Sequence, residues 1–254
     1  MPKSRISSVF LKAIFIAIVL VLVLIIFPKK TSEFQFDYSQ IAEIDIPQNY
    51  PIHGIDVSHY NGDLQWKAIK QADLFDTTSL KFVFIKATEG KTLKDSHFSK
   101  NWNNSKKHGF VRGAYHFYIA SRDPIEQAKN FCKTVKLEKG DLPPVCDFEG
   151  QYGKPKIQIK KDLIKFLDYI QNHFDVLPIL YTNSKLYELI IDGDDSFTKY
   201  KVWLASYERK EIKVRENLLM WQHNTLGKVP GSSKSIDYNV FLGSESDFNS
   251  ILIK

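Results

Sequence analysis

Four acidic residues in short apolar segments are the side chains best suited to chemistry in this sequence. Asp147 and Glu149 stand two residues apart in the phrase VCDFEG, Asp56 lies in GIDVS and Asp237 lies in SIDYN. Alternate residues of a strand point to the same face, so Asp147 and Glu149 are expected to project together. Crowding two carboxyls raises the pKa of one of them, which keeps a proton available near neutral pH. Such a pair suits cleavage of a glycosidic bond, in which one carboxyl protonates the leaving oxygen and the other acts as nucleophile, base or charge stabiliser.

Two other interpretations of these acids stay open at the level of sequence. Acids at strand ends often neutralise basic partners, and Lys86 and Arg112 are candidates here. Carboxylate oxygens also bind calcium or magnesium, but the sequence has no loop with EF-hand-like spacing. It has no HExxH motif, no Cys/His cluster at zinc-ligand spacing and no glycine-rich phosphate loop. The sequence therefore predicts neither a metal site nor a cofactor.

Eight short apolar segments with strand character must position the acids. They begin near residues 53, 81, 111, 142, 176, 200, 218 and 235. The first five intervals are 24 to 34 residues long and leave room for a helix between parallel strands, whereas the last two are only 18 and 17 residues long. This pattern predicts an α/β fold, a β/α barrel whose late helices are short or missing, with an open doubly wound sheet as the alternative. In a β/α barrel the chemistry lies at the carboxyl ends of the strands, and the acids are expected there.

Two helices have clear sequence signals. Residues 157–174 carry apolar side chains at three- and four-residue steps, which is typical of a helix with one buried face. Asp123 and Pro124 are expected to begin another helix, as its N-cap and first-turn proline.

The N-terminus predicts a membrane segment. Residues 9–27 are apolar except for Lys12, which is close to the length a helix needs to cross a bilayer. Lys3 and Arg5 precede this run, Lys12 lies near its start, and Lys29 and Lys30 follow it, which favours a cytoplasmic N-terminus and an exported C-terminal part. No small-residue cleavage site follows, so we favour an uncleaved signal-anchor at residues 1–30 over a cleaved signal that would release a secreted protein. Residues 31–50 are expected to form a linker, and residues 51–254 the catalytic barrel.

The positive net charge comes mainly from this N-terminal segment. Five of the 35 basic residues of the 254-residue chain lie within the first 30, and the remainder has 30 basic against 29 acidic residues. A nearly neutral domain gives no basis for nucleic-acid binding. The two cysteines, Cys132 and Cys146, cannot form a disulfide framework, and we expect two buried free thiols, with a disulfide as the alternative.

Aromatic residues on or just after the predicted strands favour a carbohydrate ligand. Tyr115, Tyr181 and Trp203 belong to this group. Sugar rings pack their apolar faces on aromatic rings, and tyrosine hydroxyls can hydrogen-bond to sugars. The alternative for any single ring is ordinary barrel core. His116 stands near the acids, but we interpret it as a structural hydrogen-bonding residue.

These phrases together resemble the lysozymes of glycoside hydrolase family 25. The matching phrases follow the family's order across residues 54–241: GIDVSHYNGDLQW, KFVFIKATEG, GAYHFY, LPPVCDFEG, LYT, VWLASY, MWQH and IDYNVF. The resemblance implies a flattened β/α (TIM-like) barrel with five βα units followed by three β-strands. It also implies hydrolysis of the β-1,4 bond between N-acetylmuramic acid and N-acetylglucosamine in peptidoglycan.

The resemblance also implies residue roles. Glu149 would be the general acid/base, Asp147 its assisting partner, and Asp56 a further catalytic acid of the cleft. In a route assisted by the 2-acetamido group of the substrate, Asp147 would orient that group; direct attack by Asp147 is the alternative. The remaining candidates are substrate-binding residues, namely Asp237, Tyr181, Tyr115, Trp203 and Gln222.

Two rival functions remain at this level. A chitinase-like glycosidase would share the barrel, but its Asp-x-x-Asp-x-Asp-x-Glu run is absent before Asp147. A catalytically silent peptidoglycan-binding module would keep the cleft without the chemistry. The expected partners are peptidoglycan glycan strands and, through residues 9–27, a membrane; no nucleic acid is expected, and we expect a monomer.

Overall fold

The computed structural model describes residues 35–74, 79–207, 212 and 215–254, and the stretch from Gln35 to Lys254 forms one unit. The signal-anchor predicted at residues 1–30 lies outside the described residues. Within the described part of the chain, no helix combines the length and apolar character needed to cross a membrane.

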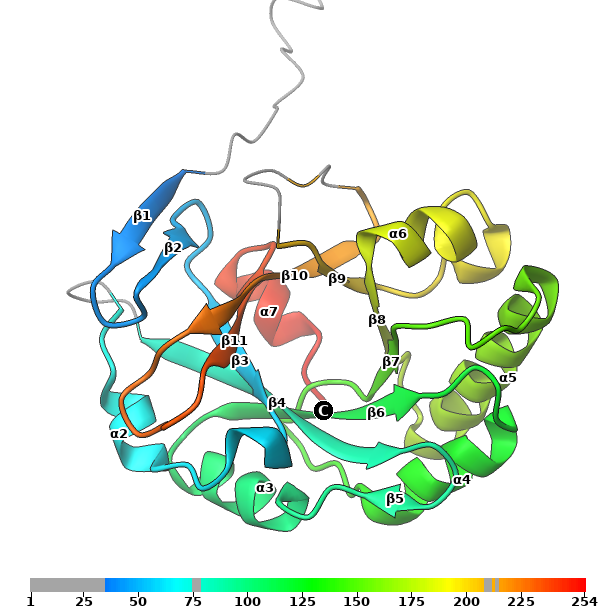
Figure 1. Cartoon of the computed structure of the whole chain (residues 1–254), viewed down its shortest axis with the longest axis horizontal. Helices are drawn as coiled ribbons and strands as arrows, with labels where there is room; N and C mark the ends of the chain where they lie inside the picture. The colour runs from blue at the N-terminus through cyan, green and yellow to red at the C-terminus, as the bar shows by residue number, and fades with distance from the viewer. Residues whose placement is uncertain (1–34, 75–78, 208–211, 213–214) are drawn as a thin grey trace, which may run out of the picture. The chain divides into compact units, whose positions relative to one another are not determined.

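Eight strands close into a barrel (Figure 1). Around the barrel the order is β3, β11, β10, β9, β8, β7, β6, β4, and the pairing of β3 with β4 completes the circle. This closure excludes the open doubly wound sheet. Neighbouring strands are parallel except at β11, which runs antiparallel to both β10 and β3. The barrel strands are β3 (His53–Val57), β4 (Leu80–Glu89), β6 (Val111–Tyr118), β7 (Val145–Phe148), β8 (Ile179–Asn183), β9 (Val202–Ala205), β10 (Leu218–Gly227) and β11 (Ile236–Phe241).

Helices follow the first five barrel strands and are then absent until the end of the described chain, as the shortening intervals predicted. The five are α2 (Trp66–Gln71), α3 (Phe98–Lys107), α4 (Pro124–Thr134), α5 (Lys156–Phe174) and the short α6 (Ser184–Leu186), which continues as the π-helical turn η2 (Tyr187–Ile191). Two short elements, η1 (His59–Asn61) and β5 (Leu93–Lys94), lie in the loops after β3 and β4. The 3-10 turn η3 (Asp195–Phe197) precedes β9, and α7 (Glu245–Ser250) follows β11.

Both helix signals in the sequence are confirmed. The Asp123 side chain accepts hydrogen bonds from the backbone N–H groups of Ile125 and Glu126, so it caps α4 directly before Pro124. Helix α5 begins at Lys156, one residue before the expected start, and its apolar stripe is buried against the barrel.

A hairpin that the sequence did not indicate packs against β10 of the barrel. Strands β1 (Phe36–Ser39) and β2 (Ile44–Pro47) pair antiparallel, within the stretch interpreted as linker. The Phe36 ring meets Trp221 of β10 edge-on, and the backbone N–H of Lys228 donates to the Ala42 carbonyl. The sequence signal is weak, because the buried apolar side chains Ala42, Ile44 and Ile46 are few and share the buried face with Ser39 and Pro47.

Large side chains fill the lower part of the barrel and leave the mouth to polar residues. Phe84 stacks on Trp203 at 4.5 Å between ring centroids. Gly113 makes room for the Phe84 ring, because a Cβ at this position would lie 2.3 Å from Cε1 of Phe84. Gly54 makes room for the Phe82 ring in the same way. The close-packed floor therefore holds the side chains at the mouth in fixed positions.

Candidate active site

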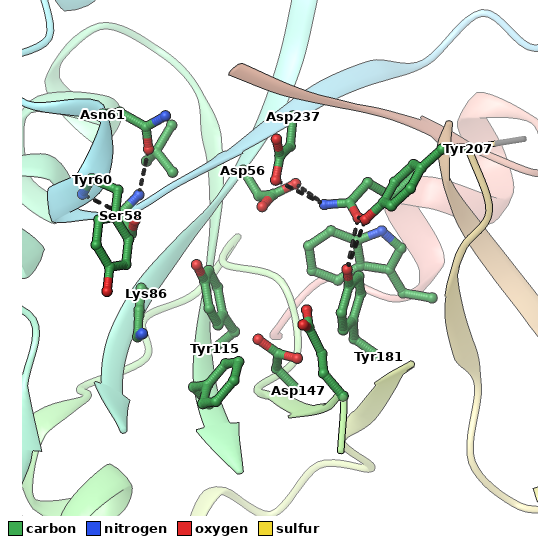
Figure 2. A pocket seen from close by; sticks show the side chains of 15 residues that line it. Asp56, Ser58, Tyr60, Asn61, Lys86, Tyr115, Asp147, Tyr181, Tyr207 and Asp237 are labelled. Carbon is green, nitrogen blue, oxygen red and sulfur yellow. Dashed lines mark hydrogen bonds between the residues drawn. The ribbon is translucent and has the colours of Figure 1, made fainter. Parts of the chain in front are cut away.

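A cavity of about 380 Å³ opens at the mouth of the barrel, where the parallel strands end (Figure 2). All the site residues predicted from the sequence line it: Asp56, Tyr115, Asp147, Glu149, Tyr181, Trp203, Gln222 and Asp237. The structure adds residues that the sequence did not single out as a site, namely Val57, Ser58, Tyr60 and Asn61 from the end of β3 and the turn η1.

The acids come from three strands. Asp147 lies in β7, Glu149 follows the end of β7, and Asp56 lies in β3. The prediction that Asp237 lies at the carboxyl end of its strand is wrong: it is the second residue of β11. It reaches the same mouth because β11 runs antiparallel, which pairs Asp237 directly with Asp56.

Burial raises the pKa of all four carboxyls, because a charge that leaves water loses its solvation. For Asp147 the shift is large, and the neighbouring charge of Glu149 adds to the effect of burial. Burial also raises the pKa of Glu149, while Tyr181 and Lys86 oppose the shift. The pKa of Asp237 is raised by burial first and by Asp56 second. Burial therefore favours the protonated form of these carboxyls, which suits acid catalysis.

Asp56 is held by two side-chain amides. Gln222 Nε2 and Asn239 Nδ2 each donate to Asp56 Oδ2 at 2.8 Å. Burial still raises the pKa of Asp56, and these two donors oppose that shift. Asn239 also accepts a hydrogen bond from Trp203 Nε1 at 2.8 Å, so it ties the ring at the cavity floor to the acid. Sequence reasoning missed Asn239, although its position two residues after Asp237 in a strand was a usable signal.

Lys86 is the cationic side chain among the described residues that line the cavity. Its Nζ lies 2.6 Å from Glu89 Oε2 and 4.8 Å from the centroid of the Phe117 ring. Its charge lowers the pKa of both Asp147 and Glu149, although burial outweighs it in each case. The four acids are therefore not simply partners of strand-end cations. Among the described residues that line the cavity, one cationic side chain faces four carboxyls, so the acids cannot all be neutralised by pairing.

Some aromatic side chains of the cavity form its floor, and others lie at its rim. Trp203 is 2% exposed and stacked on Phe84, so it forms floor. Tyr181 is also buried and meets Trp203 edge-on. Tyr60 and Tyr207 are 72% and 49% exposed, and they lie on opposite sides of the acids (Figure 2). Two exposed rings that flank a polar centre suit a long ligand with apolar faces, such as a glycan.

Other side chains noted in the sequence are structural. His116 is fully buried, with Nδ1 2.7 Å from the Thr88 hydroxyl and its ring stacked on Phe166, so it takes no part in the cavity. Cys132 and Cys146 are buried free thiols, as expected. No group of three or more His, Cys, Asp or Glu side chains in the part of the chain that the structure describes is arranged to hold a metal ion.

A closed β/α barrel whose mouth gathers protonatable carboxyls is the arrangement expected of a glycoside hydrolase. Residues 55–232 match the glycosyl hydrolases family 25, and the chain belongs to this family. The chain is 32% identical over 259 residues to the uncharacterized protein YegX of Escherichia coli O157:H7, covering 95% of this chain and 94% of that protein. It is 28% identical over 207 residues to Lysozyme M1 of Streptomyces globisporus, covering 76% of this chain and 68% of that protein.

Solved structures give the same assignment. The bacterial lysozyme from Streptomyces coelicolor superposes with a TM-score of 0.72 at 27% identity, covering 81% of this chain and 98% of that one. A family 25 glycosyl hydrolase from Bacillus anthracis superposes with a TM-score of 0.69 at 30% identity, covering 82% of this chain and 96% of that one.

Proposed function

We propose that this protein is an N-acetylmuramidase that hydrolyses the β-1,4 bond between N-acetylmuramic acid and N-acetylglucosamine in peptidoglycan. The observation that carries the proposal is the convergence of Asp147, Glu149, Asp56 and Asp237 in one open cavity. Relatives described as an autolytic lysozyme of Clostridium acetobutylicum, 30% identical over 190 residues, and an N,O-diacetylmuramidase of Arthroderma benhamiae, 33% identical over 118 residues, support this substrate class.

Glu149 is the proposed general acid/base. Burial favours its protonated form, and it lies at the open mouth. In the first step it protonates the glycosidic oxygen while the bond from that oxygen to the anomeric carbon breaks. In the second step it accepts a proton from the water that attacks the anomeric carbon, which returns Glu149 to its acid form.

Asp147 assists at the anomeric centre. In the proposed route the carbonyl oxygen of the substrate's own 2-acetamido group forms the transient bond to the anomeric carbon, and Asp147 orients that group and accepts its N–H. Asp147 suits this role because it is 5% exposed and its Oδ1 has no hydrogen-bond partner. A buried acceptor without a partner is costly, and substrate would supply the missing donor.

Substrate contacts follow from the shape of the cavity. The acids lie in the centre, and Tyr115 faces them from β6 (Figure 2). We place Asp237, Tyr115, Tyr181 and Trp203 against the sugars at the cleavage point, and Tyr60 and Tyr207 against sugars further along the strand. No cofactor takes part in this scheme.

The decisive test compares the parent with Glu149→Gln and with the matched control Glu188→Gln, an exposed glutamate outside the cavity. Purified peptidoglycan should lose turbidity with the parent and the control, and mass spectrometry should find products with N-acetylmuramic acid at the reducing end. Glu149→Gln should lower the rate by about 10²–10⁴-fold, the usual contribution of a general acid.

The rivals give other outcomes. A silent binding module would bind walls without releasing products. A chitinase-like enzyme would cleave chitin oligosaccharides. Clearance by Glu149→Gln at the parent rate would contradict the assignment of the acid.

Action in the cell envelope is consistent with this substrate. We propose further that residues 9–27 anchor the protein in a membrane with the barrel exported, and that the enzyme is a monomer. Membrane extraction of the intact chain, followed by mass measurement of its N-terminus, distinguishes an uncleaved anchor from a cleaved signal that yields a secreted enzyme.

A further inference from the structure

The turn η1, which follows β3, forms one rim of the cavity. Ser58, Tyr60 and Asn61 line the cavity from this turn (Figure 2). Tyr60 is largely exposed, so most of its ring surface is accessible to a ligand. An exposed ring that rotates freely loses conformational entropy when it stacks on a sugar, and this loss weakens binding. The contacts that hold Tyr60 in place therefore affect how well it binds.

Asp95 connects this turn to strand β4. It lies between β5 and α3, and its side chain is fully buried. Its Oδ2 atom accepts a hydrogen bond from the backbone N–H of His59 at 3.0 Å, and its Oδ1 atom accepts one from the backbone N–H of His97 at 2.9 Å. The backbone N–H of Asp95 donates to the Ala87 carbonyl in β4 at 2.9 Å. The buried carboxyl therefore fixes the turn after β3 against the barrel wall.

The same carboxyl holds the side chain of His59. His59 Nδ1 lies 2.7 Å from Asp95 Oδ2, which is hydrogen-bond distance. The His59 ring packs in turn against the Tyr60 ring, with 4.0 Å between the ring centroids and an interplanar angle of 37°. The Nζ atom of the buried Lys86 lies 5.9 Å from the centroid of the Tyr60 ring, within the range of a cation–π contact. Two side chains that the barrel holds in place therefore contact the Tyr60 ring.

We propose that Asp95 and His59 are positioning residues that hold the Tyr60 ring as a preformed stacking surface for a sugar of the glycan strand. The inference rests on the proposed function, because it takes a glycan strand as the substrate. Tyr60 lies at the rim and not between the acids (Figure 2). A contact there is made equally before and during bond cleavage, so it strengthens binding of the strand without changing the rate of the chemical step. The two positioning residues therefore set the affinity for substrate and not the turnover number.

The test is a double-mutant cycle of His59→Ala and Tyr60→Ala in the intact chain, read as KM and kcat. The substrate is a peptide-free oligosaccharide of eight alternating N-acetylglucosamine and N-acetylmuramic acid units. Tyr60→Ala should raise KM by about 3–10-fold and leave kcat unchanged, because it removes one stacked ring. His59→Ala should raise KM by about 2–5-fold while Tyr60 is present, and should not change it in the Tyr60→Ala background. An equal effect of His59→Ala in both backgrounds, an unchanged KM in either single variant, or a fall in kcat alone overturns the proposal.

The role of Asp95 is tested through its partner, because His59 is partly exposed whereas Asp95 is buried. His59→Phe keeps a ring beside Tyr60 but loses the hydrogen bond from Nδ1 to Asp95, so it should also raise KM. A parent value of KM in His59→Phe would remove Asp95 from the proposal.

His97→Ala is the matched control. The backbone N–H of His97 still bonds to Asp95 in this variant, and the side chain that is removed contacts Asp63 at 3.5 Å and Ser96 at 3.1 Å. KM and kcat should therefore stay at the parent values. A rise in KM as large as that of His59→Ala would show that any loosening of this rim weakens binding, and would overturn the specific role of His59.

A binding measurement separates this inference from the proposed function. In the Glu149→Gln background, the dissociation constants of the same oligosaccharide, measured by calorimetry, should follow the pattern predicted for KM. This readout needs no catalysis, so a pattern without coupling between His59 and Tyr60 overturns the inference alone. If the parent releases no muropeptides, or if Glu149→Gln is as active as the parent, the proposed function fails, and the dissociation constants still decide the role of His59.

Discussion

Replacement of Asp147 by Asn should stabilise the protein while it removes activity. Asp147 is 5% exposed, and burial followed by the charge of Glu149 raises its pKa well above the usual 3.8. A carboxyl whose pKa is raised in the folded state supports folding at low pH and loses that support as the pH rises. At neutral pH the unfolded chain has released this proton, whereas burial favours its retention in the folded protein, so the acid opposes folding.

The size of this effect follows from the linkage relation. While the folded protein holds the proton and the unfolded chain does not, the difference grows by about 1.4 kcal/mol per pH unit above the usual pKa. This sets an upper limit of roughly 4 kcal/mol at pH 7. The other carboxyls of the cluster adjust when Asp147 is replaced, and this adjustment reduces the gain in stability below the upper limit. We expect a gain in the free energy of unfolding of about 1–2 kcal/mol, or about 2–8 °C in the unfolding midpoint.

The assay is thermal and denaturant unfolding of parent and Asp147→Asn between pH 4 and pH 8, with wall clearance measured in parallel. The stability difference should increase with pH, and clearance should fall. A matched control is Asp162→Asn, because Asp162 pairs with Lys154 and its pKa is lowered; this variant should lose stability instead. If Asp147→Asn is less stable than the parent at pH 7, or if its advantage is larger at pH 4 than at pH 7, the reasoning about burial is refuted.

Two further predictions concern buried groups away from the acids. Asp141→Asn should lower the unfolding free energy by about 3–5 kcal/mol in chemical denaturation, because it leaves the buried Arg112 without its bidentate partner at 2.8 and 3.2 Å; a loss below 1 kcal/mol would contradict this. Burial lowers the pKa of His53 to about 4 and of His223 to about 3, so these groups favour the folded state above pH 6.5 and cost stability as the pH falls below it. Stability measured from pH 7 to pH 4.5 should therefore fall more steeply in the parent than in His223→Phe, and equal slopes would show that His223 does not contribute.

Much of the fold was predictable because local patterns report local burial. The intervals between strand segments predicted helices after the first five strands and short or missing helices after the later ones, and the described residues follow this order. The cap formed by Asp123 and the apolar stripe of α5 were equally local signals. The hairpin of β1 and β2 was not predictable, because three small or branched apolar residues give too weak a pattern and its burial depends on β10.

The sequence by itself determined which acids could do the chemistry, because Asp147 and Glu149 share a strand end and strand alternation is a local property. Only the tertiary structure decided how Asp56, Gln222 and Asn239 meet, because these residues are 166 and 183 positions apart in the chain. Their contact depends on closure of the barrel and on the reversed direction of β11. Local periodicity carries no information about strand direction or about which distant strands pair. Strand direction and strand pairing bring together the side chains that hydrogen-bond to Asp56 and so affect its protonation.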